Sequence, residues 1–308
     1  MNEQKEIKAL ALNGGGVRGY LQLQLLREKY GEFFVPYKNY EYIAGCSVGG
    51  LIAGLFGIGL SVREAIKIFE ENVNKIFSRT WTFPIFCDYK YKSSGIDEVL
   101  KNIFEDNMFY ETKNRVKLLI PAYSTKRKRI KIFKNYSEQF MQIKHVLRAT
   151  MSAPIYFEPY TFASQYFCDI GDWDTFLDGG VGGGISNNPS LILFVELLRF
   201  RSKKLNGEKL TIENIGTGRN VRSSNGELPE TIIGLLKDGV IEPLMESSQE
   251  MVKQTMLAMN EKVANLNYVC VDPFLRKEVQ LDDVDALPFL KGVAQKYFRM
   301  FENEKGGY

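Results

Sequence analysis

The first third of the chain contains two similar units, in each of which an apolar run, a glycine-rich turn and a second apolar segment follow one another. Residues 7–12 are apolar and predict a buried strand, and leucines at helical spacing predict a helix over residues 20–30. The second unit repeats this order, with a short strand at residues 42–44 and a buried helix at residues 51–59. Strands that alternate with helices indicate a mainly parallel α/β sheet.

Hydrophobic periodicity predicts more elements beyond these two units. Ser61 and Glu64 have the spacing of a capping box and predict the start of a helix over residues 62–77. Further helices are expected at residues 96–104, 141–151 and 189–201, strands at 116–122, 130–133, 175–177 and 211–215, and mainly helix over 230–301. The strands at 116–122 and 130–133 are expected to form a hairpin. We expect an α/β/α three-layer sandwich, with its core in residues 1–220 and a mostly helical C-terminal part, residues 221–308, packed on the same domain.

Composition narrows the class of protein. The 40 Lys and Arg residues nearly balance the 37 Asp and Glu residues, so the net charge of +3 does not indicate a nucleic-acid polymer as partner. The four cysteines, Cys46, Cys87, Cys168 and Cys270, are scattered, which argues against a disulfide framework or a zinc site and favours a reducing compartment. The polar residues 1–6 lack a signal core, and the apolar run at 51–60 is shorter than the roughly 20 residues that span a bilayer. We expect a cytoplasmic protein that contacts the inner membrane surface, at most, from the side.

A serine lies in the turn of the second unit, between the predicted strand and helix. Residues 45–49 have the pattern Gly-x-Ser-x-Gly, with Ser47 at its centre. A sharp strand-to-helix turn exposes such a hydroxyl, and Gly45 and Gly49 avoid clashes within the strained backbone. An ordinary glycine-serine turn would have the same letters, but the flanking strand and helix favour a nucleophile elbow, with Ser47 as the nucleophile.

The glycine loop of the first unit has two interpretations. Residues 14–19 fit the dinucleotide-binding pattern, which requires an acidic residue about 20 positions later, at the end of the second strand. Glu41 instead precedes that strand. In the other interpretation the loop is an oxyanion hole, in which the amides of Gly14, Gly15 and Gly16 approach an ester oxygen and Arg18 adds positive charge. The neighbouring serine elbow favours the oxyanion hole.

The chain offers few candidates for the base that a serine nucleophile needs. His145 is the only histidine and lies on a predicted helix, whereas triad histidines commonly lie on loops that reach the serine. Asp178 ends a predicted strand directly before two glycines, although an ordinary turn would also favour these residues. Asp169, Asp172 and Asp174 are nearby competitors that do not precede a glycine pair. We predict that Asp178 is the base.

Two further features have a lipid-binding and a plain structural interpretation. The basic run at residues 126–129 could bind lipid phosphates or form the solvated tip of the predicted hairpin. Four methionines on predicted C-terminal helix could form an adaptable surface for acyl chains or pack in the core: Met245, Met251, Met256 and Met259.

The motifs together resemble the patatin-like phospholipases over residues 7–218. The similar segments, in the family's order, are the glycine loop at 13–19, the serine elbow at 45–49, an Ala-Thr-x-Ser-Ala-Pro segment within 148–157, the Asp-Gly-Gly and Asn-Asn-Pro motifs within 178–189, and a Gly-Thr-Gly turn at 216–218. Asn13 replaces the family's usual aspartate, which removes any salt link from that position. Cys46 and Val48 replace the commoner threonines of the elbow without removing a catalytic atom.

The resemblance implies a patatin-like sandwich fold, with a Ser47–Asp178 dyad that hydrolyses fatty acyl esters of phospholipids through an acyl-enzyme, without metal or cofactor. Head-group preference and oligomeric state stay open. An acyltransferase would use the same dyad with a lipid in place of water. Some bacterial relatives are switched on by cyclic nucleotides in anti-phage defence, so a membrane-degrading effector that is silent in isolation is another alternative. A nucleotide-binding module would instead bind NAD or ATP and not react with a fluorophosphonate.

Overall fold

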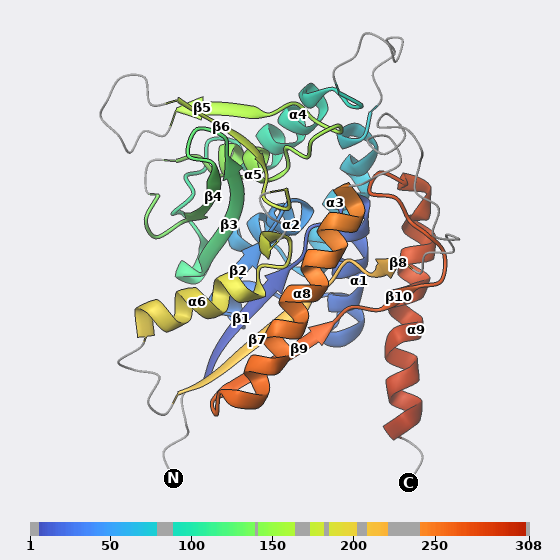
Figure 1. Cartoon of the computed structure of the whole chain (residues 1–308). Coiled ribbons are helices and arrows are strands. Elements are labelled where there is room, and N and C mark those ends of the chain that lie inside the picture. Colours follow the sequence, from blue (N-terminus) through green and yellow to red (C-terminus); the bar gives the residue numbers. More distant parts are fainter. Residues whose placement is uncertain are drawn as a thin grey trace.

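The computed structural model describes residues 6–78, 89–138, 141–163, 173–181, 185–201, 208–220 and 241–305 (Figure 1). Several sequence predictions concern residues outside these ranges. They are the cysteines Cys87 and Cys168 and the competing carboxylates Asp169 and Asp172.

A mostly parallel sheet forms the centre of the molecule, in the strand order β5-β6-β3-β2-β1-β7-β9, with β4 paired to β3. The strands are β1 (Glu6–Leu12), β2 (Tyr42–Gly45), β3 (Lys117–Ser124), β4 (Arg129–Lys134), β5 (Tyr160–Ala163), β6 (Trp173–Asp178), β7 (Lys209–Ile215) and β9 (Leu266–Val271). The pairs β1–β2, β2–β3, β1–β7 and β7–β9 are parallel, and β3–β4, β3–β6 and β5–β6 are antiparallel. The short strands β8 (Arg219–Asn220) and β10 (Phe274–Leu275) pair separately.

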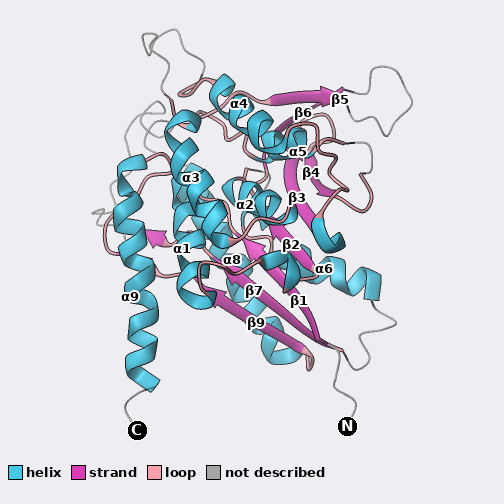
Figure 2. Ribbon diagram, turned by 180° about the vertical axis from the view of Figure 1, so that it is seen from behind, coloured by secondary structure: helices cyan, strands magenta, loops and turns pink. Residues whose placement is uncertain are grey.

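Helices cover both faces of this sheet. One face carries α1 (Gly19–Tyr30), α2 (Val48–Gly57), α3 (Val62–Ile76), α4 (Ser93–Phe104) and α5 (Ile143–Thr150), and α9 (Leu287–Lys305) packs against α1. The other face carries α6 (Ser190–Arg201) and α8 (Ile241–Lys262). Helix α8 crosses in front of the sheet in Figure 1, and the opposite layer faces the viewer in Figure 2.

The alternation of side chains along β1 shows why both faces are covered. Leu10 and Leu12 belong to the core beneath α1 and α2, whereas Ile7, Ala9 and Ala11 belong to the core beneath α6 and α8. Successive residues of a strand point to opposite faces, so a strand that is apolar throughout must be buried on both sides. The expected α/β/α three-layer sandwich is confirmed.

The predicted elements are confirmed with small shifts of their ends. Ser61 caps α3, where its hydroxyl accepts the N–H of Glu64 at 3.3 Å and the Glu64 carboxylate accepts the Ser61 N–H at 2.7 Å. The basic run at 126–129 lies at the tip of the β3–β4 hairpin, as predicted.

The strands β5, β8, β9 and β10 were not predicted. The expectation of mainly helix after residue 230 is wrong for β9, which extends the sheet beside β7 through six residue pairs from Leu210–Leu266 to Ile215–Val271. A strand this short, between two long helices, gives little periodic signal. The division of the chain near residue 220 stays a prediction. None of the described helices has both the length and the apolar character needed to span a bilayer.

Candidate active site

Ser47 lies at the sharp turn between β2 and α2. Its backbone has φ 52° and ψ −123°, a conformation that a non-glycine residue rarely adopts and that costs about 1–3 kcal/mol. The two elbow glycines are needed for close packing, because a Cβ on Gly45 would lie 2.0 Å from the Gly49 carbonyl oxygen and one on Gly49 would lie 2.3 Å from the Leu12 carbonyl oxygen. The turn is therefore fixed against β1.

Thr150, at the end of α5, holds the elbow in place. The Ser47 N–H donates to Thr150 Oγ1 at 3.0 Å, and the Thr150 hydroxyl donates to the Pro121 carbonyl of β3 at 2.6 Å. Thr150 is fully buried, so neither bond competes with solvent. Our sequence interpretation did not assign Thr150 to the site, and the signal that could have found it is the family-like segment at 148–157.

Asp178 is the last residue of β6 and is fully buried. Its Oδ1 accepts the Gly180 N–H at 2.7 Å and lies 3.9 Å from the Cys46 Sγ, whereas Oδ2 has no hydrogen-bond partner among the described residues. Burial raises the pKa of this carboxyl from 3.8 to about 6, and the nearby Ser47 hydroxyl is the foremost group that opposes the rise. Ser47 and Asp178 line the same cavity.

The two competing bases that the structure describes, Asp174 and His145, lie elsewhere. Asp174, further back on β6, accepts the Ser124 hydroxyl at 2.6 Å. His145 shares a 2.6 Å hydrogen bond with the Tyr160 hydroxyl and stacks on Phe162, and burial lowers its pKa. It lines a different cavity, beside β5.

The glycine loop forms one wall of the cavity through Gly15 and Gly16. Gly16 has φ +57°, and a Cβ on it would lie 2.0 Å from the Leu281 carbonyl oxygen, so glycine is required there on both counts. The N–H of Gly14 donates to the Asn187 carbonyl at 3.0 Å, which turns this amide away from the oxyanion role expected for it.

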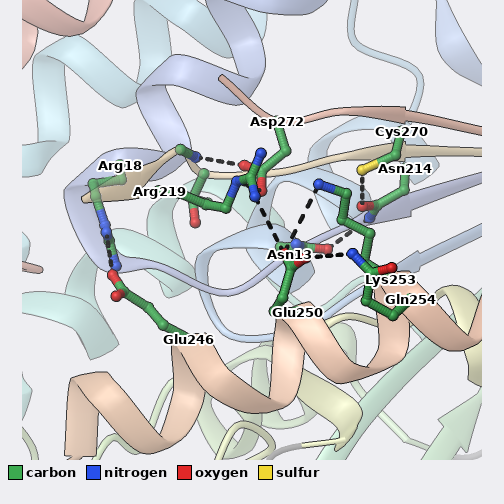
Figure 3. Close-up of polar contacts among 12 residues, drawn as sticks. Asn13, Arg18, Asn214, Arg219, Glu246, Glu250, Lys253, Gln254, Cys270 and Asp272 are labelled. Atoms are coloured by element: carbon green, nitrogen blue, oxygen red, sulfur yellow. Dashed lines mark hydrogen bonds and ion pairs between the residues drawn. The ribbon is translucent and has the colours of Figure 1, made fainter. Parts of the chain in front are cut away.

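Arg18 differs from its expected role as a positive charge in the oxyanion hole. Its side chain is 3% exposed and pairs with Glu246 of α8 at 2.9 Å (Figure 3). Arg18 is not among the residues that line the cavity beside Ser47. The guanidinium is drawn to Glu246 because a buried charge requires a partner. Asn13 makes a neutral contact, in which its Oδ1 accepts the Asn214 Nδ2 at 2.6 Å.

The cavity beside Ser47 is narrow and apolar, with a volume of about 40 Å³. Its apolar wall comes from α3, the segment after α5, the N-terminal part of α8 and the loop before α9, and includes Phe69, Val73, Phe157, Met245 and Leu281. The volume holds a few water molecules and is far below the roughly 300–1,000 Å³ of typical ligand pockets. Among the described residues, no cluster of three or more His, Cys, Asp or Glu side chains could hold a metal.

The three-layer fold places the strained serine turn beside the glycine loop, an arrangement typical of α/β proteins that have a Gly-x-Ser-x-Gly elbow. The family model for patatin-like phospholipases matches residues 10–194, and the chain belongs to this family.

Curated relatives extend the similarity. A cGAMP-activated phospholipase of Escherichia coli (strain TW11681) is 27% identical over 242 residues, which are 70% of this chain and 63% of the relative. The protein of the same name from Vibrio cholerae is 28% identical over 70% of this chain and 65% of its own length. The one from Pseudomonas aeruginosa is 28% identical over 90% of this chain and 81% of its own length. The chain thus spans slightly less than two thirds of the first two relatives.

Proposed function

We propose that this protein is a lipid acyl hydrolase of the phospholipase A type, in which Ser47 and Asp178 form a catalytic dyad. The observation that carries the proposal is that both residues line one apolar cavity, where one oxygen of the buried carboxylate has no hydrogen-bond partner among the described residues. An unpartnered buried carboxylate oxygen lowers the stability of the fold, so it is expected where it serves a function. Accepting the proton of a serine nucleophile is such a function.

The mechanism follows from these positions. Ser47 Oγ attacks the acyl carbonyl carbon, and its proton passes to Asp178 Oδ2. The N–H groups of Gly15 and Gly16 hold the negative charge that develops on the carbonyl oxygen. The tetrahedral intermediate collapses, the bond to the lipid alcohol breaks, and the departing alcohol takes the proton from Asp178. Water then gives a proton to Asp178, attacks the acyl-enzyme and releases the fatty acid, and the proton returns to Ser47.

The lining of the cavity supports a fatty acyl chain as the group that is bound. Phenylalanine, valine and methionine side chains surround Ser47, and an apolar wall gains free energy when it covers an apolar chain. Phospholipids carry such chains, and the family and the names of the curated relatives favour them as substrates. If a lipid alcohol attacks the acyl-enzyme in place of water, the same dyad performs acyl transfer.

A second proposal, regulation by a cyclic nucleotide, is favoured by the size of the cavity. A volume of about 40 Å³ cannot admit an acyl chain unless the wall formed by Met245, Leu281 and their neighbours moves. Curated relatives are named cGAMP-activated and cUMP-AMP-activated phospholipases. We propose that this site is closed in the ligand-free state and opens when such a ligand binds.

Both proposals are tested by product analysis. The wild-type protein and its Ser47→Ala variant are incubated with vesicles of mixed phospholipids, alone and with cGAMP or cUMP-AMP, and released fatty acids, lysolipids and transacylated lipids are identified by mass spectrometry. We expect fatty acid and lysolipid from the wild type, more with a cyclic dinucleotide, and none from Ser47→Ala. Equal release by the two proteins would contradict the role of Ser47. Release that cyclic dinucleotides do not change would contradict only the regulation.

A further inference from the structure

A second and larger cavity lies between α9 and the end of β9. Its volume is about 840 Å³, within the range of roughly 300–1,000 Å³ that is typical of small-molecule sites. It opens beside the segment that follows β9, and α8 forms another side through Lys253. Neither Ser47 nor Asp178 lines it, so it is separate from the catalytic cavity.

The charged residues of this cavity are predominantly cationic. Arg219, Lys253, Arg276 and Lys296 line it, against the single carboxylate of Asp272. Arg219 and Lys253 share Glu250 at 3.4 Å and 3.8 Å, and Arg219 also lies 3.5 Å from Asp272 (Figure 3).

The other two cations, Arg276 and Lys296, form no ion pair within the part of the chain that the structure describes. Unpaired cations in a concave site attract a ligand with more than one negative charge, such as phosphate groups, and arginine suits phosphate because its fork donates two hydrogen bonds.

Flat rings accompany these charges. Phe274 is 61% exposed, and the Arg219 guanidinium lies 3.9 Å from the centre of its ring. Phe289 and Tyr297 line the cavity from α9. Exposed aromatic and guanidinium planes offer stacking surfaces for the flat rings of a ligand. Phosphate charges and flat rings in one molecule are the chemistry of a nucleotide.

We propose that this cavity is the binding site of a cyclic dinucleotide, and that binding of this ligand causes the catalytic cavity to open. Two phosphates and two bases match four cations and three aromatic residues in a volume of about 840 Å³. The inference rests on the proposed function for its consequence, the activation of lipid hydrolysis, but not for the binding itself.

Two elements connect the two cavities. The first is the segment from Asp272 to Leu281, which lines the larger cavity at its start and the catalytic cavity at its end. Asp272 accepts the Gly218 N–H at 2.9 Å, and the Leu281 carbonyl accepts the Val17 N–H of the glycine loop at 2.8 Å. A ligand beside Asp272 thus acts on the same segment that closes against the oxyanion loop.

The second element is α8, which carries Lys253 in the larger cavity and Met245 in the catalytic one. Between them, Gln249 Nε2 donates to the Gly14 carbonyl at 2.9 Å, Glu246 pairs with Arg18 of the same loop, and Glu250 pairs with Arg219 (Figure 3). Phosphate groups that pair with Arg219 and Lys253 would break the ion pairs of these residues with Glu250. The N-terminal half of α8 would then be held less firmly, and Met245 could move away from Ser47.

Isothermal titration calorimetry of the full chain tests the site without any need for hydrolysis. The Ser47→Ala protein, which should bind as the wild type does, is titrated with cGAMP, cUMP-AMP, AMP and inorganic phosphate. Arg276→Ala and Lys296→Ala are expected to weaken cyclic dinucleotide binding about tenfold each, and Phe274→Ala by a similar factor. Lys291→Ala is the matched control, because this exposed lysine lies on α9 outside the cavity and should leave the affinity unchanged. Circular dichroism checks that each variant is folded.

The results separate this inference from the proposed function. Binding of a cyclic dinucleotide that Arg276→Ala and Lys296→Ala weaken supports the site even if no lipid is hydrolysed. Two outcomes would overturn it: no cyclic dinucleotide binds, or one binds equally well to these variants and to the Lys291→Ala control. If phosphate binds as tightly as the cyclic dinucleotides, the cavity is a general anion site and the inference is also wrong.

Discussion

The cavity beside Ser47 and the cavity beside α9 differ in volume and in charge. The first has a volume of about 40 Å³, is walled by apolar side chains and encloses one buried carboxylate, whereas the second has about 840 Å³ and four cationic residues. In the small cavity the backbone of Ser47 is strained and the carboxylate of Asp178 is shielded from water. The large one presents charges and an aromatic ring to solvent. Such a division suits chemistry at one site and recognition of a soluble anion at the other.

The sharpest test of the catalytic side compares Asp178→Asn with His145→Ala. Asp178→Asn removes the proposed base but keeps the shape of the side chain, so we expect turnover to fall by about 10⁴-fold or more. His145→Ala breaks a hydrogen bond to Tyr160 in another cavity and should keep most activity. Both are measured as steady-state fatty acid release by proteins whose fold is checked by circular dichroism. An active Asp178→Asn protein together with a folded, inactive His145→Ala protein would replace the dyad with a histidine-based site.

Substitution in the glycine loop, the proposed oxyanion hole, should give the next largest effect. A Cβ on Gly15 would lie 2.4 Å from the Thr217 hydroxyl oxygen, so Gly15→Ala must push the loop away from its position beside Ser47. Loss of one oxyanion donor costs about 10²–10³ in turnover number. The measurement is kcat with a soluble short-chain ester, and Lys291→Ala serves as control, because this exposed residue lines neither cavity. An unchanged kcat in Gly15→Ala would mean that the loop has another task.

The pH dependence follows from the raised pKa of Asp178. A base acts only when it is deprotonated, so kcat/KM should fall about tenfold for each pH unit below about 6 and level off above it. The protonated carboxyl stabilises the fold fully below pH 3.8, and this contribution is lost as pH rises through about 6. The shift corresponds to about 3 kcal/mol. Asp178→Asn should therefore gain stability relative to the wild type as pH rises from about 4 to about 6 in urea unfolding, with a constant difference above about 7. A constant difference across the whole range from about pH 4 to about pH 7 would show that the carboxyl does not titrate there.

The residues around the Ser47 cavity have a clearer pattern in the sequence than the residues of the large cavity. Ser47, Gly15 and Gly16 lie in local turns whose residue types are dictated by backbone geometry, so their pattern is visible in the chain itself. The partners of Arg18 and Gly14 are not local, since Glu246 and Asn187 lie far along the chain and meet them only through tertiary packing. That is why the assignment of both to the oxyanion hole did not anticipate these contacts.

The residues that line the large cavity form no local sequence pattern of this kind. Arg219, Lys253, Arg276 and Lys296 come from separate elements and are interspersed with acidic residues, so no basic run marks them. The strand β9, which supports the cavity, was predicted as helix. The one basic run that the sequence does show, at 126–129, lies on a hairpin tip elsewhere.

The smallest expected effect tests whether α8 closes the catalytic cavity. Met245 lines this cavity and is 6% exposed, with its Cε 2.6 Å from the position that a Cβ on Gly180 would take. Met245→Ala widens the cavity beside Asp178, so we expect basal fatty acid release to rise roughly two- to fivefold and the further gain with cGAMP to shrink, a change of about 0.4–1 kcal/mol in the barrier.

Met251→Ala is the control for this prediction, because Met251 lies on the same helix and is 66% exposed. Truncation of a buried methionine commonly costs 2 kcal/mol or more, so rates are compared at a temperature where thermal unfolding shows both variants to be folded. The affinity for cGAMP should stay the same in Met251→Ala and rise by no more than the same roughly two- to fivefold in Met245→Ala, because coupling between two sites is reciprocal and Met245 makes no direct contribution to the larger cavity. If Met245→Ala keeps the basal rate and the full response to cGAMP, α8 does not close the site, and the coupling between the two cavities must run through the segment from Asp272 to Leu281 alone.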